Sequence, residues 1–60
     1  MSITSFSQVF SRTVSGHMIR IFQGRGYHVG YVDGARVTGY ISGFGPCLSW
    51  CQEVAEAAGC

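Results

Sequence analysis

A chain of 60 residues, of which 47% are hydrophobic, is long enough for one small domain spanning residues 1–60 and too apolar for a disordered segment. Its four basic residues are all arginine, and with three acidic residues they leave a net charge of +1. So few arginines argue against a general nucleic-acid binder, which typically neutralises about 6–10 phosphates. The start MSITSFSQVF lacks both a basic segment and a long apolar run, so we expect no signal peptide, no membrane span and a cytoplasmic location.

Residues 1–16 admit two interpretations. Ile3, Phe6 and Phe10 recur at helical spacing, which would suit an amphipathic helix. However, serine, threonine, valine and phenylalanine dominate this segment, and Ser15-Gly16 is suited to a turn. We therefore favour an edge strand over about residues 8–14 that turns back onto His17.

The next segment, residues 17–23, has the alternation of a strand. A glycine loop, Gly24-Arg25-Gly26, then joins it to a strand that starts near Tyr27. Ile19 and Ile21 should point to the buried side of the sheet, while Met18, Arg20 and Phe22 should point to the other side.

Asp33-Gly34 between two β-rich runs is a strong hairpin signal, because a type I′ turn needs positive φ at both central residues. If Val32 faces Ala35, the pairs that follow are Tyr31–Arg36, Gly30–Val37, Val29–Thr38, His28–Gly39 and Tyr27–Tyr40. One face is then small and apolar, with Gly30, Val32, Ala35, Val37 and Gly39. The other face carries three tyrosines.

A helix is predicted over about residues 46–58, with Pro46 at its first position and Gly59 as its stop. Ser49 and Gln52 could form a capping box, which would start the helix later. Its apolar stripe comprises Cys47, Trp50, Cys51, Val54 and Ala58, and Trp50 should fill the space that the sheet glycines leave. We therefore predict an α+β fold: an antiparallel sheet of three to four strands with one C-terminal amphipathic helix packed on one face.

The three cysteines do not form a convincing metal site. Cys47 and Cys51 lie one helical turn apart, and Cys60 or His28 could complete a tetrahedral zinc site, but the usual paired spacing is absent. An odd number of cysteines also argues against a closed disulfide framework, although Cys60 could link two chains. We expect Cys47 and Cys51 to be small hydrophobic core residues, with no metal and no cofactor.

No catalytic residues are predicted, and we do not expect an enzyme. Neither His17 nor His28 has an acid placed by sequence to orient it. His28 should lie on the helix-covered face as a hydrogen-bonded structural histidine. The loop Gly24-Arg25-Gly26 lacks the lysine of a phosphate-binding loop and does not lead into a helix.

The face opposite the helix is the candidate binding surface. It should carry Met18, Arg20, Phe22, Tyr27, Val29, Tyr31, Arg36, Thr38 and Tyr40, and tyrosine and arginine are enriched where proteins bind one another most tightly. With the loop-tip arginine added, the predicted partner-binding residues are Arg20, Phe22, Arg25, Tyr27, Tyr31, Arg36 and Tyr40. Two alternatives remain: residues 1–16 could cover this face, or the face could form a homodimer interface.

The hairpin GYHVGYVDGARVTGYI followed by the helix PCLSWCQEVAEAAG, in a short lysine-free chain, resembles small inhibitor proteins encoded by bacteriophages, anti-CRISPR proteins among them. The resemblance implies stoichiometric binding to a bacterial protein or ribonucleoprotein complex. Such inhibitors are often acidic DNA mimics, whereas this chain is not acidic. The resemblance therefore implies an inhibitor that obstructs a surface of its partner protein rather than one that mimics DNA. The alternative is a small nucleic-acid-binding domain in which Tyr27, Tyr31 and Tyr40 stack on bases.

Overall fold

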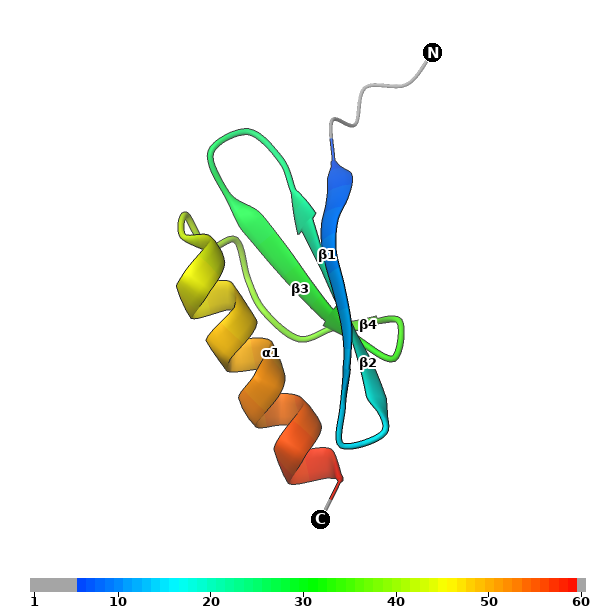
Figure 1. Ribbon diagram of the computed structural model, residues 1–60. Coiled ribbons are helices and arrows are strands. Elements are labelled where there is room, and N and C mark those ends of the chain that lie inside the picture. Colours follow the sequence, from blue (N-terminus) through cyan, green and yellow to red (C-terminus); the bar gives the residue numbers. More distant parts are fainter. Residues whose placement is uncertain (1–5, 60) are drawn as a thin grey trace.

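The computed structural model describes residues 6–59, and it has the predicted α+β architecture (Figure 1). Four strands form one antiparallel sheet in the order β1-β2-β3-β4, and helix α1 packs on one face of that sheet. The elements are β1 (Ser7–Val14), β2 (His17–Gln23), β3 (His28–Val32), β4 (Ala35–Arg36) and α1 (Phe44–Ala58). No helix among the described residues is long and apolar enough to cross a membrane.

Two tight turns set the order of the strands, and both were predicted. Ser15 and Gly16 join β1 to β2 with φ values of 53° and 81°, and Asp33 and Gly34 join β3 to β4 with 54° and 84°. Positive φ at both central residues is the requirement of a type I′ turn, whose twist matches that of the flanking strands. The strand interpretation of the amino-terminal segment is thereby confirmed for residues 7–14, whereas Ile3 lies outside the described residues.

The register between β2 and β3 places the two faces as expected. Ile19 is opposite Val32, and Ile21 is opposite Gly30, on the side that α1 covers. Because side chains alternate along a strand, the intervening Arg20 points to the opposite face. The predicted division of residues 17–23 between a core side and an aromatic side is confirmed.

The pairing predicted beyond β4 is wrong after Val37. The nitrogen of Val37 still donates to the oxygen of Gly30, at 3.0 Å, but the next paired residue is Ile41, which bridges His28. The intervening chain bulges away from β3. Thr38 turns inward, where its hydroxyl oxygen accepts a hydrogen bond from the nitrogen of Gly30 at 2.8 Å. Thr38 is therefore buried on the helix side rather than part of the aromatic face.

β1 contains a bulge that changes which face its side chains join. Gln8 is opposite Phe22 and Phe10 is opposite Ile21, so Val9 is an extra residue in β1. A regular strand would place residues 8 and 10 on the same side. With the bulge, Phe10 joins the helix side and packs against the core, where its ring lies 5.4 Å from that of Phe44.

Helix α1 begins two residues earlier than predicted, at Phe44, with Gly43 as its extended N-cap. Pro46 is therefore the third helical residue. The correction has a simple cause: N–H groups of the first turn have no partner within the helix, so proline costs little anywhere in that turn. The helix ends at Ala58 as predicted, but Gly59 keeps a right-handed backbone and its nitrogen donates to the oxygen of Ala55 at 3.0 Å.

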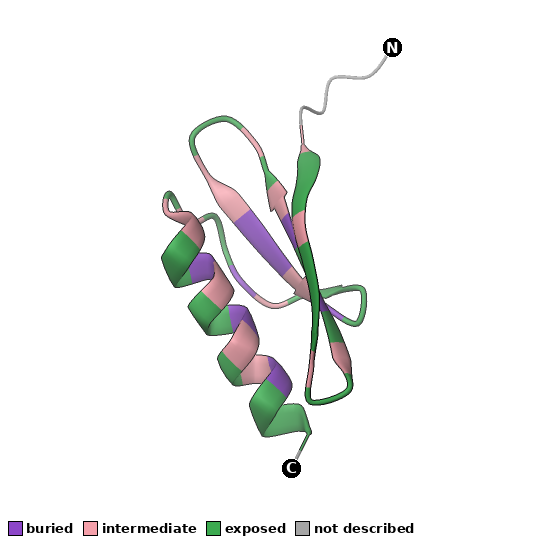
Figure 2. Cartoon of the chain, in the orientation of Figure 1, coloured by how far each residue is buried: buried purple, intermediate pink, exposed green. Residues whose placement is uncertain are grey.

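The core lies between α1 and the sheet, and Figure 2 shows the buried helix positions facing the strands. It consists of Ile19, Ile21, Val32, Cys47, Cys51 and Ala55. The prediction that Trp50 fills the space above the sheet glycines is wrong, because its side chain is 47% exposed and Cys51 lies against Gly30 instead. The predicted apolar stripe also included Ala58, which is exposed, as is Ala35 on the sheet.

Candidate functional site

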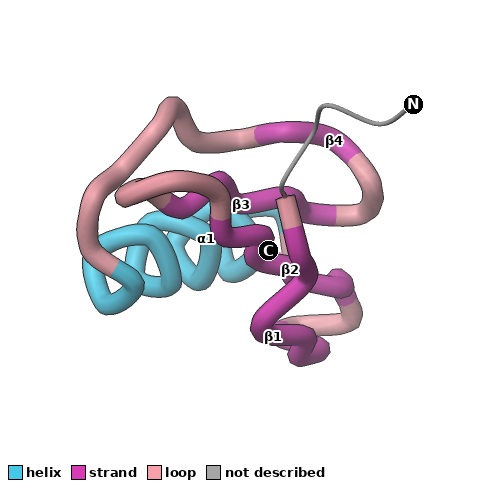
Figure 3. Tube along the Cα trace, turned by 90° about the horizontal axis from the view of Figure 1, so that it is seen from above, coloured by secondary structure: helices cyan, strands magenta, loops and turns pink. Residues whose placement is uncertain are grey.

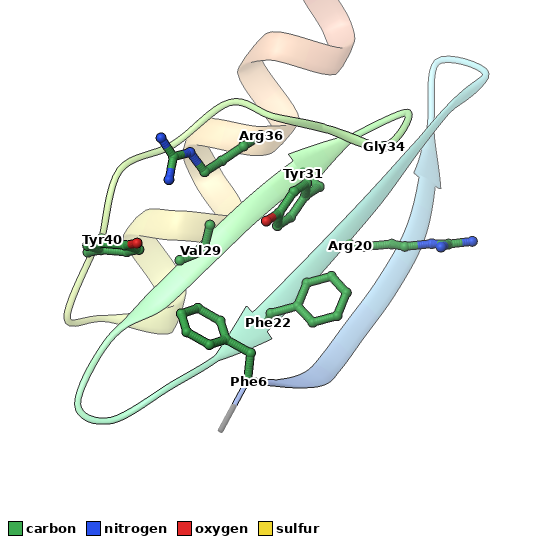
Figure 4. A pocket seen from close by; sticks show the side chains of 8 residues that line it. All are labelled: Phe6, Arg20, Phe22, Val29, Tyr31, Gly34, Arg36 and Tyr40. Atoms are coloured by element: carbon green, nitrogen blue, oxygen red, sulfur yellow. The ribbon is translucent and has the colours of Figure 1, made fainter. Parts of the chain in front are cut away.

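The face opposite α1 carries an open groove with a volume of about 570 Å³ (Figure 4). Its lining residues come from the start of the described chain, from β2, β3 and β4, from the β3–β4 turn and from the segment after β4. They are Phe6, Arg20, Phe22, Val29, Tyr31, Gly34, Arg36 and Tyr40. None of these eight residues is acidic.

A cross-strand row forms the centre of this groove. Arg20 on β2 is opposite Tyr31 on β3, and Tyr31 is opposite Arg36 on β4. The pairing of Tyr31 with Arg36 was predicted from the turn. The two arginine side chains extend away from Tyr31 in opposite directions, so positive charge flanks the tyrosine on both sides (Figure 4).

Two groups of aromatic rings extend from this row toward the β2–β3 loop. The Phe22 ring meets that of Tyr31 edge-on, with 5.4 Å between the ring centroids. In the second group, Tyr27 and Tyr40 have centroids 4.7 Å apart, and Phe6 contacts both rings. The guanidinium carbon of Arg36 lies 5.9 Å from the Tyr40 centroid, within the range of a cation–π interaction.

Val29 forms the floor of the groove. It is opposite Phe22 on the aromatic face, yet its side chain is only 1% exposed and it lies apart from the core beneath α1. The surrounding rings therefore shield it from water. This small second apolar cluster fixes the floor and the walls of the groove relative to each other.

Five of the seven predicted partner-binding residues line the groove, namely Arg20, Phe22, Tyr31, Arg36 and Tyr40. Tyr27 lies beside the groove and packs on Phe6 and Tyr40. Arg25 is exposed at the β2–β3 loop, next to Gly26 with its φ of 70°, and does not line the groove. Residues 6–14 do not cover the face: β1 extends the sheet beside β2, and Phe6 forms part of the groove wall.

Phe6 is the aromatic groove residue that the sequence interpretation missed, and Gly34 of the β3–β4 turn was not assigned to the groove either. Phe6 was grouped with Phe10 in a possible helical stripe, although the two rings lie on opposite faces of the sheet in the structure. The bulge at Val9 separates them, and a bulge has no clear sequence signal in a run such as SQVFSRTV. No simple alternation could have placed both rings correctly.

Outside the groove, His17 and Asp33 form an ion-pair contact at the end of the sheet, between the two tight turns. The Nδ1 atom of His17 is 2.5 Å from Oδ2 of Asp33, and the other carboxylate oxygen accepts a hydrogen bond from the nitrogen of Met18 at 3.0 Å. The contact with His17 and then that with Met18 lower the pKa of Asp33. Sequence reasoning did not find this acid for His17, because the two residues are brought together only by the pairing of β2 with β3.

The cysteines of α1 lie in the core, as predicted, rather than at the groove. Cys47 and Cys51 are free thiols with no exposed surface. Burial, and secondarily the neighbouring Cys47, raises the pKa of the Cys51 thiol to about 11, so this thiol is protonated near neutral pH. No three potential metal ligands cluster among residues 6–59, and Cys60 lies outside the described residues.

His28 lies on the helix side, as expected, where its ring meets that of Phe44 edge-on at 5.7 Å. The expected hydrogen bond is not present: the buried Nδ1 atom has no partner among the residues that the structure describes. His28 therefore packs as an aromatic ring at the end of the core nearest the start of α1.

Comparison of the chain with known protein families, characterised proteins and solved structures finds no match. Aromatic walls and a valine floor suit an apolar side chain, and two flanking guanidinium groups suit carboxylates.

Proposed function

We propose that the protein is a non-catalytic protein-binding module whose aromatic groove holds a segment of a partner protein. The observation that carries this proposal is the composition of the groove: a sheltered valine floor, walls of phenylalanine and tyrosine, and an arginine on each side of Tyr31. Aromatic residues and arginine are enriched among the residues that contribute most to protein–protein affinity.

The charges of the groove favour a partner segment that carries carboxylates. Arg20 and Arg36 are both lining residues, and no lining residue is acidic. A segment with an apolar side chain between two carboxylate-bearing residues would fill the space above Val29 and meet both guanidinium groups. Charge complementarity of this kind speeds association and disfavours basic partners.

In its narrower form, the proposal is a phage or mobile-element inhibitor that acts in the bacterial cytoplasm on a defence or regulatory complex. Its support is the resemblance, in size and hairpin-plus-helix architecture, to small phage-encoded inhibitors. The groove adds a means of stoichiometric action, because a groove that binds an acidic segment of a partner would obstruct the surface around that segment.

The test compares capture of bacterial proteins by the wild type, by the double variant Tyr31→Ala/Arg36→Ala and by Ser49→Ala, which alters the exposed far side of α1. Proteins bound by the wild type and Ser49→Ala but lost with the double variant are then purified for affinity measurement. Each anchor is expected to contribute about 2 kcal/mol, which is about 30-fold in Kd, so loss of both in the double variant should weaken the Kd by roughly several hundredfold. Equal binding by all three proteins would overturn the proposal.

The nucleic-acid alternative is tested on the same variants with labelled single-stranded DNA and RNA. Tyr27, Tyr40 and Phe6 already contact one another, which leaves fewer ring faces for stacked bases. We expect weak binding. Tight oligonucleotide binding that falls steeply with salt and requires Tyr31 would replace the protein-binding proposal.

A further inference from the structure

β1 leaves a long strand edge without a neighbour. Among the described residues it pairs only with β2, and it lies at the end of the sheet away from β4 (Figure 3). Edge strands expose a row of backbone N–H and C=O groups, and proteins usually protect them with charged side chains, proline, bulges or short length. The bulge of β1 lies at Val9, and the stretch of residues 10–14 after it is regular. The eight residues SQVFSRTV contain neither lysine nor proline, and Arg12 is their only charged residue.

We propose that this edge binds a second copy of the chain, with β1 of each copy paired antiparallel across a two-fold axis. The two four-stranded sheets would then form one continuous sheet, with both helices on the same face and both grooves on the other. This interface is separate from the groove, so the inference does not rest on the proposed function.

The geometry of the pair restricts the register. A two-fold axis perpendicular to the sheet leaves each side chain on the same face in both copies. Residues that lie opposite each other across the interface must share a face, so in a regular strand they are an even number of positions apart. The axis therefore passes through a residue of β1 that lies opposite the same residue of the second copy. An axis at Arg12 would place two like charges directly opposite each other, which is unfavourable. An axis at Thr13 would leave only a few pairs before the Ser15-Gly16 turn, and one at Phe10 would bring both Val9 bulges into the centre.

An axis at Ser11 avoids all three problems. Phe10 then lies opposite Arg12 of the second copy on the helix face, where an arginine and an aromatic ring attract each other. Val9, whose side chain is 45% exposed, lies opposite Thr13 of the second copy. The strand has residues on both sides of Ser11 to extend this pairing, and a chain of only 60 residues gains from a partner because its own core is small.

The first test is the mass of the wild-type protein by sedimentation equilibrium over a range of concentrations, compared with Ser11→Glu and Thr13→Glu. A glutamate at position 11 would lie beside Arg20 in its own chain but opposite the same glutamate of the second copy. We expect a wild-type dimer that Ser11→Glu weakens by about fivefold or more, whereas Thr13→Glu, opposite Val9, should weaken it less. A wild-type monomer at every concentration would overturn the inference.

The second test fixes the register. In a Cys60→Ser background, Ser11→Cys should form a disulfide-linked dimer under mild oxidation, because directly opposite residues lie within reach of a disulfide. Thr13→Cys is the matched control, since residue 13 would be separated from its own copy by about four residues along the strand, roughly 13 Å. If the protein is a dimer but Ser11→Cys cross-links no better than Thr13→Cys, the dimer interface lies elsewhere and the inference is wrong.

Discussion

The sulfur of Cys51 lies directly against the backbone of Gly30, so no room remains for a β-carbon at that position. The same space is limited by the methyl carbon Cγ2 of Thr38, which would lie 3.1 Å from such a β-carbon. Helix and sheet are therefore in direct contact where the strand has no side chain. A cysteine rather than the predicted tryptophan occupies the space above this glycine.

The variant Gly30→Ala should lose about 1–3 kcal/mol of unfolding free energy, because a methyl group forced into a filled core displaces its neighbours. Urea denaturation followed by circular dichroism would measure the loss. Gly39→Ala is the matched control, since a β-carbon there meets no atom within 4 Å. Equal stability of the two variants would show that α1 does not pack on Gly30.

The variant Trp50→Ala should remain folded, with a loss of about 1 kcal/mol, because only about half of the indole is removed from water. The comparison is Ile21→Ala, which empties a fully buried position and should cost about 2–5 kcal/mol. Thermal melts of both variants provide the measurement. If Trp50→Ala proved the more damaging of the two, α1 would have to pack with its other side toward the sheet.

These two positions mark the limit of what the sequence could predict about the fold. The strands, both tight turns and the helix follow from alternation, from Ser15-Gly16 and Asp33-Gly34, and from helical spacing. The rotation of α1 does not follow, because Cys51 and Trp50 lie on adjoining parts of one apolar stripe. The close approach at Gly30 favours the small cysteine and leaves the large indole at the rim.

Acid should weaken the fold through Asp33. Its pKa is lower in the folded protein than the ordinary 3.8, so the native state favours the carboxylate. The resulting stabilisation is fully present above pH 3.8 and is lost as the pH falls through the lowered value. Asp33→Asn keeps a turn residue that accepts positive φ but removes the titration. Urea midpoints between about pH 2 and 5 should therefore fall more steeply for the wild type than for Asp33→Asn; parallel curves would contradict the assignment.

Cys47 and Cys51 should resist thiol reagents in the native protein. Both are buried, which limits access of the reagent, and the pKa of Cys51 is raised to about 11, so little Cys51 thiolate exists at pH 8. In a Cys60→Ser variant, modification should be slow and should accelerate in urea as the chain unfolds. Rapid reaction of either thiol without denaturant would show that the helix side of the core opens readily.

Part of the groove was predictable from the sequence, because strand alternation and one turn fix which side chains share a face. Arg20, Tyr31 and Arg36 share a face because the strands alternate and the Asp33-Gly34 turn fixes their register. The departure of Thr38 from that face was not predictable, since it requires the chain to leave β3 after Val37 and rejoin it at Ile41. Regular alternation cannot anticipate an interruption that depends on contacts with α1.

The extra residue Val9 makes β1 serve two sides of the molecule at once. Ahead of it Phe6, the residue just before β1, forms part of the wall of the groove, and after it Phe10 contributes to the core. Removal of this residue would therefore do more than shorten the chain by one position. In one half of β1 the side chains would change from the helix side of the sheet to the groove side, or the reverse. Either the groove would lose Phe6 from its wall or the core would lose the ring of Phe10.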